Sequence, residues 1–189
     1  ADLGMFPGAL GSDLEQPAEM GVGIAYVMGQ HTFAFDYKKI EWSDAKGYQD
    51  FGWDDQDVYA FGYQYTEDNW ALRAGYNRAD HPITEAPSGG PLQPSQSPTG
   101  SYPNAGGDAL NLFNMVGFPA TAEEHYTIGG SYAFSKTFTL DLAYVYADET
   151  STTMNGIVGV NPSTGDLFTG PVTVDHSEDS ISFQLTYNF

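Results

Sequence analysis

The chain of 189 residues has no cysteine and few cations, with 6 basic residues against 25 acidic ones and a net charge of -19. The absence of cysteine excludes disulfides and thiolate metal sites. So acidic a chain repels phosphate backbones, and nucleic acid is therefore not expected as a partner. No apolar run approaches the roughly 20 residues of a membrane helix. This excludes a helical membrane protein but not a β-barrel, whose strands are short and only half apolar.

The sequence does contain repeated alternation of apolar and polar residues. Alternation is typical of strands, because successive side chains point to opposite faces. The clearest case is the carboxyl-terminal ISFQLTYNF, in which small uncharged polar residues separate Ile181, Phe183, Leu185, Tyr187 and Phe189. One face of such a strand needs an apolar medium and the other fits water. Two architectures meet this need: a soluble sandwich with one buried face, and a membrane barrel with lipid outside and a polar lumen.

The alternation predicts seven strands in a single all-β domain. Their approximate ranges are 17–28, 31–42, 57–66, 70–78, 123–134, 137–148 and 176–189. Residues 1–16 are expected to form a leading loop, and residues 79–122 and 149–175 two long loops. Within the first long loop, DALNLFNMVGF (108–118) is apolar enough for a short helix or a docked segment. The parity slips after Lys39, which predicts a β-bulge near Lys38 and Lys39.

The connections between the predicted strands alternate between short and long. The turns GQ, EDN and SK are short, and the connections between them are long. An up-and-down outer-membrane barrel has this asymmetry, with short periplasmic turns and long outer loops. Aromatic residues near the strand ends would form girdles at the two water interfaces, although Tyr and Phe are also good strand formers. The pattern favours an antiparallel up-and-down transmembrane barrel over the soluble sandwich.

Several stretches carry a family resemblance. They are FGWDDQDVYAFGYQYTEDNWALRAGYNRADHPI, FPATAEEHYTIGGSYAFSKTFTLDLAYVYAD, the terminal strand and the hairpin PAEMGVGIAYVM–HTFAFDYKKIEW. Together they resemble the carboxyl-terminal half of the outer-membrane FadL/TodX family, which carries long-chain fatty acids and other hydrophobic compounds across the bacterial outer membrane. The resemblance covers roughly residues 17–189.

The resemblance implies a fourteen-stranded barrel, of which these seven strands would be the carboxyl-terminal half. The family's amino-terminal plug, and the strand whose kink opens a lateral exit, have no counterpart in this sequence. An open half-sheet in lipid would leave two unpaired edges. The missing amino-terminal half, or a partner chain, is therefore expected to close the barrel.

Five polar residues on the predicted lumen face are candidate ligand contacts: Asp36, Lys38, Arg73, His125 and Asp141. A fatty-acid carboxylate entering the barrel needs a cation or a hydrogen-bond donor, and Lys38 and Arg73 are the candidates for this role. The same two cations could instead pair with Asp36 and Asp141 across neighbouring strands.

The apolar side chains of LNLFNMVGF are candidates for ligand capture at the outer mouth. An adaptable surface of Leu, Phe and Met suits varied apolar ligands, and the residues are Leu110, Leu112, Phe113, Met115, Val116 and Phe118. They could also pack as a lid on the mouth, and the two roles are compatible. At the carboxyl terminus, Phe183, Leu185, Tyr187 and Phe189 resemble the assembly signal of outer-membrane barrels.

The acidic loop that contains Asp44, Asp50, Asp54, Asp55 and Asp57 lacks EF-hand spacing, which favours a solvated face over a cation site. The histidines have no metal-ligand spacing, and no Gly-x-Ser-x-Gly elbow is present. The sequence therefore predicts neither a metal site nor an enzyme.

Taken together, the sequence predicts a passive outer-membrane channel for long-chain fatty acids or other hydrophobic compounds. Such a channel contacts outer-membrane lipids and needs no cofactor. Two alternatives stay open. One is a structural or adhesive outer-membrane barrel without a transport role, and the other is a soluble all-β binding module.

Overall fold

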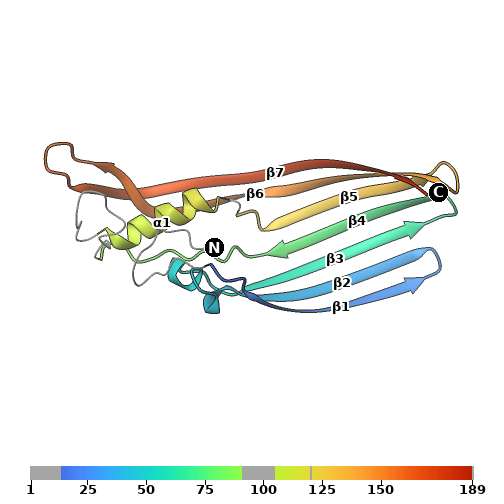
Figure 1. Cartoon of the computed structure of the whole chain (residues 1–189), viewed down its shortest axis with the longest axis horizontal. Coiled ribbons are helices and arrows are strands. Elements are labelled where there is room, and N and C mark those ends of the chain that lie inside the picture. The colour runs from blue at the N-terminus through green and yellow to red at the C-terminus, as the bar shows by residue number, and fades with distance from the viewer. Residues whose placement is uncertain (1–13, 91–104, 120, 189) are drawn as a thin grey trace.

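The computed structural model describes residues 14–90, 105–119 and 121–188, and these contain seven strands in one antiparallel sheet. Each strand pairs with its neighbours in sequence, giving the order β1-β2-β3-β4-β5-β6-β7 (Figure 1). The strands are β1 (Ala18–Met28), β2 (His31–Glu41), β3 (Gln56–Thr66), β4 (Trp70–Ala79), β5 (Glu124–Ala133), β6 (Phe138–Val160) and β7 (Leu167–Tyr187). The predicted seven-stranded meander is confirmed. Of the predicted leading loop, residues 14–17 are irregular and residues 1–13 lie outside the described part of the chain.

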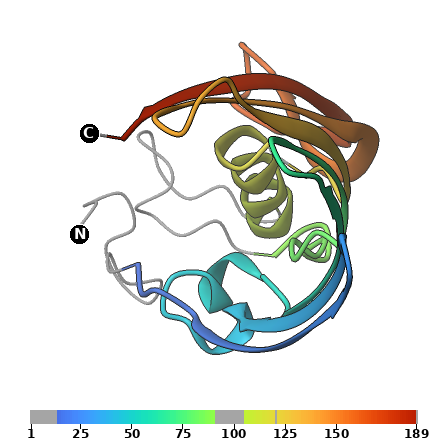
Figure 2. The ribbon, with the colours of Figure 1, turned by 90° about the vertical axis from the view of Figure 1, so that its right-hand side faces the viewer.

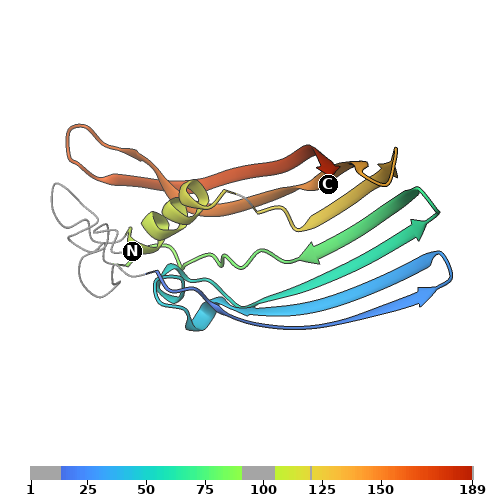
Figure 3. The same cartoon turned by 45° about the vertical axis from the view of Figure 1, so that its right-hand side comes forward.

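The sheet curves into a trough, seen end-on in Figure 2, and its concave face partly encloses the helix α1 (Gly106–Gly117). The short turns at 29–30, 67–69 and 134–137 gather at one end of the trough. In the tightest of them, Gly29 has φ 60, a left-handed conformation that suits a two-residue hairpin turn. The longer connections, with α1 and the short helices η1 (Trp42–Asp44) and η2 (Gln49–Phe51), lie at the other end (Figure 3).

The strand pairing places many aromatic rings of the convex face next to one another, in two rows across the sheet. In the first row, neighbouring rings lie 4.9–6.4 Å apart in the series Phe35, Phe61, Tyr76, Tyr126 and Tyr146. This row runs from the middle of β2 and β3 to the part of β4 and β5 near the long connections. The second row, near the short turns, includes Tyr65, Trp70, Tyr132, Phe134, Phe138 and Tyr187.

Between the two rows the convex face is exposed and apolar, with Leu72, Ile128, Leu142 and Ile181 beside the rings of Tyr144 and Phe183. The six residue steps from Tyr126 to Tyr132 correspond to about 20 Å along β5. An apolar band between aromatic girdles is the arrangement expected of a sheet that faces lipid.

Two local predictions are wrong. Residues 149–175 do not form an irregular loop, because β6 and β7 stay paired through this range and only residues 161–166 turn the chain. The range is rich in β-branched residues, which favour a strand, and its Gly and Asn residues are accommodated within the hairpin. Nor is there a bulge at Lys38 and Lys39. The pairing of β2 with β1 and β3 is uninterrupted there. Ile40 lies on the concave face with Lys38, and Lys39 and Glu41 continue the convex face as charged residues, so the apolar parity changes without a bulge.

The main buried cluster of the described residues lies at the end with the long connections. It consists of Phe51, Trp53, Ile83, Met115 and Met154. These residues come from η2, the segments flanking β3 and β4, α1 and β6. The trough thus has a packed core at its mouth, while the rest of the sheet leaves both faces open to their surroundings.

Candidate functional site

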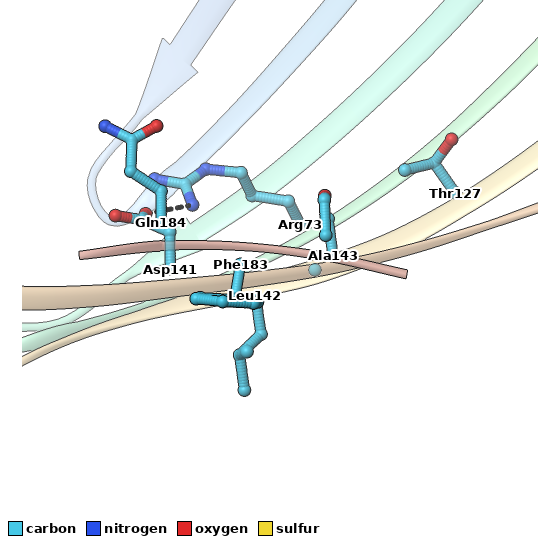
Figure 4. A pocket seen from close by; sticks show the side chains of 9 residues that line it. Arg73, Thr127, Asp141, Leu142, Ala143, Phe183 and Gln184 are labelled. Atoms are coloured by element: carbon cyan, nitrogen blue, oxygen red, sulfur yellow. Dashed lines mark ion pairs between the residues drawn. The ribbon is translucent and has the colours of Figure 1, made fainter. Parts of the chain in front are cut away.

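The concave face carries a polar cluster centred on Arg73 of β4. Arg73 Nε donates to Gln64 Oε1 at 2.7 Å, and Arg73 Nη1 lies 3.6 Å from Asp141 Oδ1. The hydroxyl of Ser131 accepts from Arg73 and donates to Asp141, so it bridges the ion pair. The register sets this arrangement, since Gln64 lies opposite Arg73 and Ser131 opposite Asp141. Figure 4 shows Arg73, Asp141 and Gln184 on one side of the sheet and Leu142 on the other.

Small side chains form the floor of the trough beside this cluster. Ala34, Gly62 and Gly75 lie opposite one another on β2, β3 and β4. Together with Arg73 and Thr127 they line one largely apolar hollow. The concave face therefore offers a flat apolar surface next to a group of hydrogen-bond donors and acceptors.

The other predicted lumen residues lie on the same face but not in the same cluster. Lys38 pairs with Glu19 at 2.9 Å. Asp36 has no ion pair within the described residues; its carboxylate lies over Gly23, where a Cβ would meet Asp36 Oδ1 at 2.0 Å. The Nδ1 atom of His125 is buried without a hydrogen-bond partner in the described structure.

The pairing of Lys38 and Arg73 with Asp36 and Asp141, which the sequence left open as an alternative, is found for Arg73 and Asp141, whereas Lys38 pairs with Glu19. The reason is the diagonal geometry of the β1–β2 pair. Lys38 lies directly opposite Gly21, so Glu19, two residues away, is within its reach.

At the mouth, α1 packs with its apolar side chains against the core. Leu110, Phe113, Met115 and Phe118 contact the buried cluster, and Leu112 packs against Gly156 of β6. Val116 is 71% exposed. The predicted helix is confirmed, and the packing of five of the six candidate capture residues matches the lid interpretation. Their role in capture stays a prediction.

A polar face of the same helix was not predicted. Asp108, Asn111 and Asn114, three residues apart on one side of α1, are almost completely buried. They bond to Gly89, Ala86, Asn155, Phe51 and Trp53. The three-residue spacing of these polar side chains in an otherwise apolar segment was the available sequence signal.

Comparison with known proteins places this geometry in a family. The family model described as Gram-negative porin matches residues 6–153. The chain belongs to the Gram-negative porin family. It is therefore an outer-membrane protein of a family of channels rather than enzymes.

Solved structures share the porin's fold. The toluene transporter TodX of Pseudomonas putida is 18% identical, with a TM-score of 0.55 over 94% of this chain and 36% of that chain. A TodX deltaS2S3 mutant, described as a monoaromatic hydrocarbon channel, is 19% identical with a TM-score of 0.57 over 92% of this chain and 36% of that chain. The porin thus spans about a third of the length of TodX, and its meander has the fold of part of that barrel. No curated protein matches it in sequence.

The outer boundary of the porin's apolar band is marked by charged residues on the convex face. Arg78 lies between Asp80 and Glu124, at 3.5 and 3.9 Å. The hydroxyl of Tyr126 donates to Glu124 at 2.6 Å, so the aromatic row that contains Tyr76, Tyr126 and Tyr146 adjoins these charged residues. Amphipathic rings with their hydroxyls toward the polar side fit the membrane–water interface.

The acidic loop of the porin has one defined ion pair. Asp55 accepts hydrogen bonds from Lys39 at 2.9 Å and from the hydroxyl of Ser43 at 2.7 Å. These two bonds hold the pKa of Asp55 below its usual range. Within the described ranges, no group of three His, Asp or Glu residues is arranged to hold a metal ion. No helix in the same ranges is long and apolar enough to cross a membrane.

The terminal strand of the porin carries the predicted assembly residues on the convex face of the sheet. Phe183, Leu185 and Tyr187 are exposed on the convex face, and Phe189 lies outside the described residues. Their role in assembly stays a prediction.

Proposed function

We propose that the porin is part of a passive channel through which hydrophobic compounds, long-chain fatty acids among them, cross the outer membrane. The observation that carries the proposal is the amphipathic trough, in which the small side chains of Ala34, Gly62 and Gly75 adjoin the Arg73 cluster. A concave, mostly apolar surface with a few convergent polar groups is the usual form of a site for an apolar ligand. The fold supports the proposal, since the TodX structures are described as a toluene transporter and a monoaromatic hydrocarbon channel.

Transport would begin with apolar contacts at the mouth and continue by diffusion along the trough, without an energy source. The guanidinium of Arg73 has five N–H donors, and Gln64 and Ser131 occupy part of them. A fatty-acid carboxylate would share Arg73 with Asp141. An uncharged compound would need no such exchange and would bind through the apolar floor.

A closed channel also needs strands beyond this sheet. The outer edges of β1 and β7 pair with no other strand in the described part of the chain. Unpaired backbone groups in lipid cost several kcal/mol each. We propose that further strands, from the same polypeptide or from a partner chain, join these two edges.

The test is uptake of a labelled long-chain fatty acid and of labelled toluene by cells with and without the protein. Gly75→Leu fills the floor of the trough, where a Cβ has only ordinary contacts at 3.6 and 3.7 Å. We expect this variant to reduce uptake of both ligands at least fivefold. Ala74→Leu places the same side chain one residue away on the lipid-facing side and should leave uptake unchanged. Uptake that is independent of the protein would contradict the proposal and support a structural barrel.

A further inference from the structure

The largest side chains that are completely buried in the described structure are polar, and all belong to α1. Asp108 is 1% exposed, and Asn111 and Asn114 are 0% exposed. Buried polar side chains are costly unless their hydrogen bonds are made. Their presence in the middle of the mouth cluster therefore calls for an explanation beyond apolar packing.

Asn111 and Asn114 tie α1 to three separate segments of the chain. The side chain of Asn111 accepts from the backbone N–H of Ala86 at 2.7 Å and donates to Ala86 O at 3.0 Å and Asn155 O at 2.9 Å. Asn114 accepts from Trp53 Nε1 at 3.2 Å and donates to Phe51 O at 2.7 Å. Each amide thus uses both its donor and its acceptor side.

The amino-terminal end of the helix is held by two hydrogen bonds to Gly89, while Asp108 Oδ1 is buried without a partner among the described residues. Asp108 Oδ2 accepts from the backbone N–H of Gly89 at 2.9 Å, and the backbone N–H of Gly107 donates to Gly89 O at 2.9 Å. The approach is so close that a Cβ on Gly107 would lie 1.9 Å from Pro87 O. Moving α1 away from these segments would break these bonds and expose Met115 and Phe51 to water, and moving it off β6 would break the bond from Asn111 to Asn155 O.

We infer that Asn111 and Asn114 are positioning residues of the transport path, which fix α1 across the outer mouth so that ligands pass beside a stationary helix. The helix is then a fixed wall of the entrance and does not open as a lid. The inference rests on the proposed function for its uptake measurement, and its structural part can be tested without uptake.

An engineered disulfide between α1 and β6 tests whether the helix must move. A Cβ built on Gly156 lies 3.4 Å from Leu112 Cβ, close to the 3.5–4.5 Å usual for disulfides. The chain has no other cysteine that could compete. Cells expressing Leu112→Cys with Gly156→Cys should show the same uptake, within about twofold, under oxidising conditions and after reduction with dithiothreitol. Uptake that is lost on oxidation and restored by reduction would overturn the inference.

Replacement of Asn111 tests the positioning role. Asn111→Leu leaves the backbone groups of Ala86 and Asn155 without this partner, and we expect uptake to fall at least fivefold while heat-modifiable migration on gels still reports a folded barrel. Adding the disulfide to Asn111→Leu should restore at least half of the uptake of the oxidised Leu112→Cys, Gly156→Cys protein, because the disulfide holds the helix by other means. Normal uptake in Asn111→Leu, or failure of the disulfide to restore it, would refute the positioning role.

Hydrogen exchange provides the measurement that does not depend on transport. The backbone amides of α1 should exchange at least a hundredfold more slowly than those of the turn at 161–166, and Asn111→Leu should remove most of this protection. Rapid exchange in the unmodified protein would contradict a fixed helix. If the protein mediates no uptake but α1 is protected, the proposed function fails and the fixed position of the helix stands.

Discussion

Replacement of Asp141 by Asn should change which ligands the trough prefers, because Asp141 is the carboxylate that neutralises Arg73. Arg73 Nη1 and Asp141 Oδ1 are 3.6 Å apart, with the Ser131 hydroxyl between them. Asn has the same shape and keeps an oxygen that can accept from Ser131, but it lacks the negative charge. Arg73 would then be available to donate charge-assisted hydrogen bonds to a ligand carboxylate.

The size of the effect follows from the exposure of the pair. The two side chains are 45% and 37% exposed, so solvent screens their attraction. An ion pair of this kind contributes about 0.5–1 kcal/mol. If that interaction is transferred to the ligand, the affinity for a fatty-acid anion rises about two- to fivefold. The affinity for toluene, which carries no charge, should not change.

The assay is the concentration of ligand that gives half-maximal uptake, measured for a labelled fatty acid and for labelled toluene. Asp36→Asn is the matched control, since it removes the same charge from the same concave face at a residue without an ion pair in the described structure. If Asp36→Asn improves fatty-acid affinity as much as Asp141→Asn does, the gain reflects overall charge. If toluene gains equally, the release of Arg73 is not the cause.

Three further predictions concern assembly, stability and pH. Ile128→Arg places a charge in the middle of the lipid-facing band, which should cost about 2–4 kcal/mol and reduce the folded fraction in heat-modifiability gels. The control variant Thr127→Arg, on the opposite face of β5, should assemble normally. Equal assembly of the two variants would contradict the assigned faces. Met115→Ala should destabilise the mouth cluster by about 2–4 kcal/mol, seen as a lower temperature for loss of α1 protection in hydrogen exchange; no change would mean that the cluster is not tightly packed. Because the pKa of Asp55 is lowered, its ion pair stabilises the acidic loop at pH values above the ordinary carboxyl pKa of about 3.9. This stabilisation is lost as the pH falls through the lower pKa that Asp55 has in the folded protein. Tryptophan fluorescence of the loop should therefore change below about pH 3.9, and Asp55→Asn should abolish this transition.

The strands of the sheet could be predicted from the sequence because lipid and lumen impose opposite demands on alternate residues. Ile181, Phe183 and Leu185 alternate with Ser182 and Gln184, and the register places the two sets on opposite faces. The same parity brought Arg73 and Asp141 to one face. Pairing partners depend on diagonal offsets as well as on parity, so parity alone did not indicate Glu19 as the partner of Lys38.

The buried face of α1 could not be predicted from the sequence with the same reasoning. In a helix, polar residues at three-residue spacing usually indicate the solvent side. The partners that make burial of Asn111 possible are backbone groups of Ala86 and Asn155. Because almost every residue has the same backbone groups, the sequence does not indicate which of them will pair with Asn111. The extension of β6 and β7 escaped prediction for a related reason, since each strand in that hairpin is supported by its partner and by α1.

The distribution of packing in the sheet has a consequence for how the porin is stabilised. Among the described residues the buried cluster lies at the mouth, while the convex side chains along the strands are exposed, as is Ile181 at 81%. The apolar band can be stable in that state only with lipid as its solvent, and the backbone edges of β1 and β7 only with strands that pair with them. The mouth, by contrast, is held by its own core and by the amides of Asn111 and Asn114. Stability of the mouth and of the spanning strands therefore has separate sources, and mutations at α1 should affect the entrance without preventing assembly of the barrel.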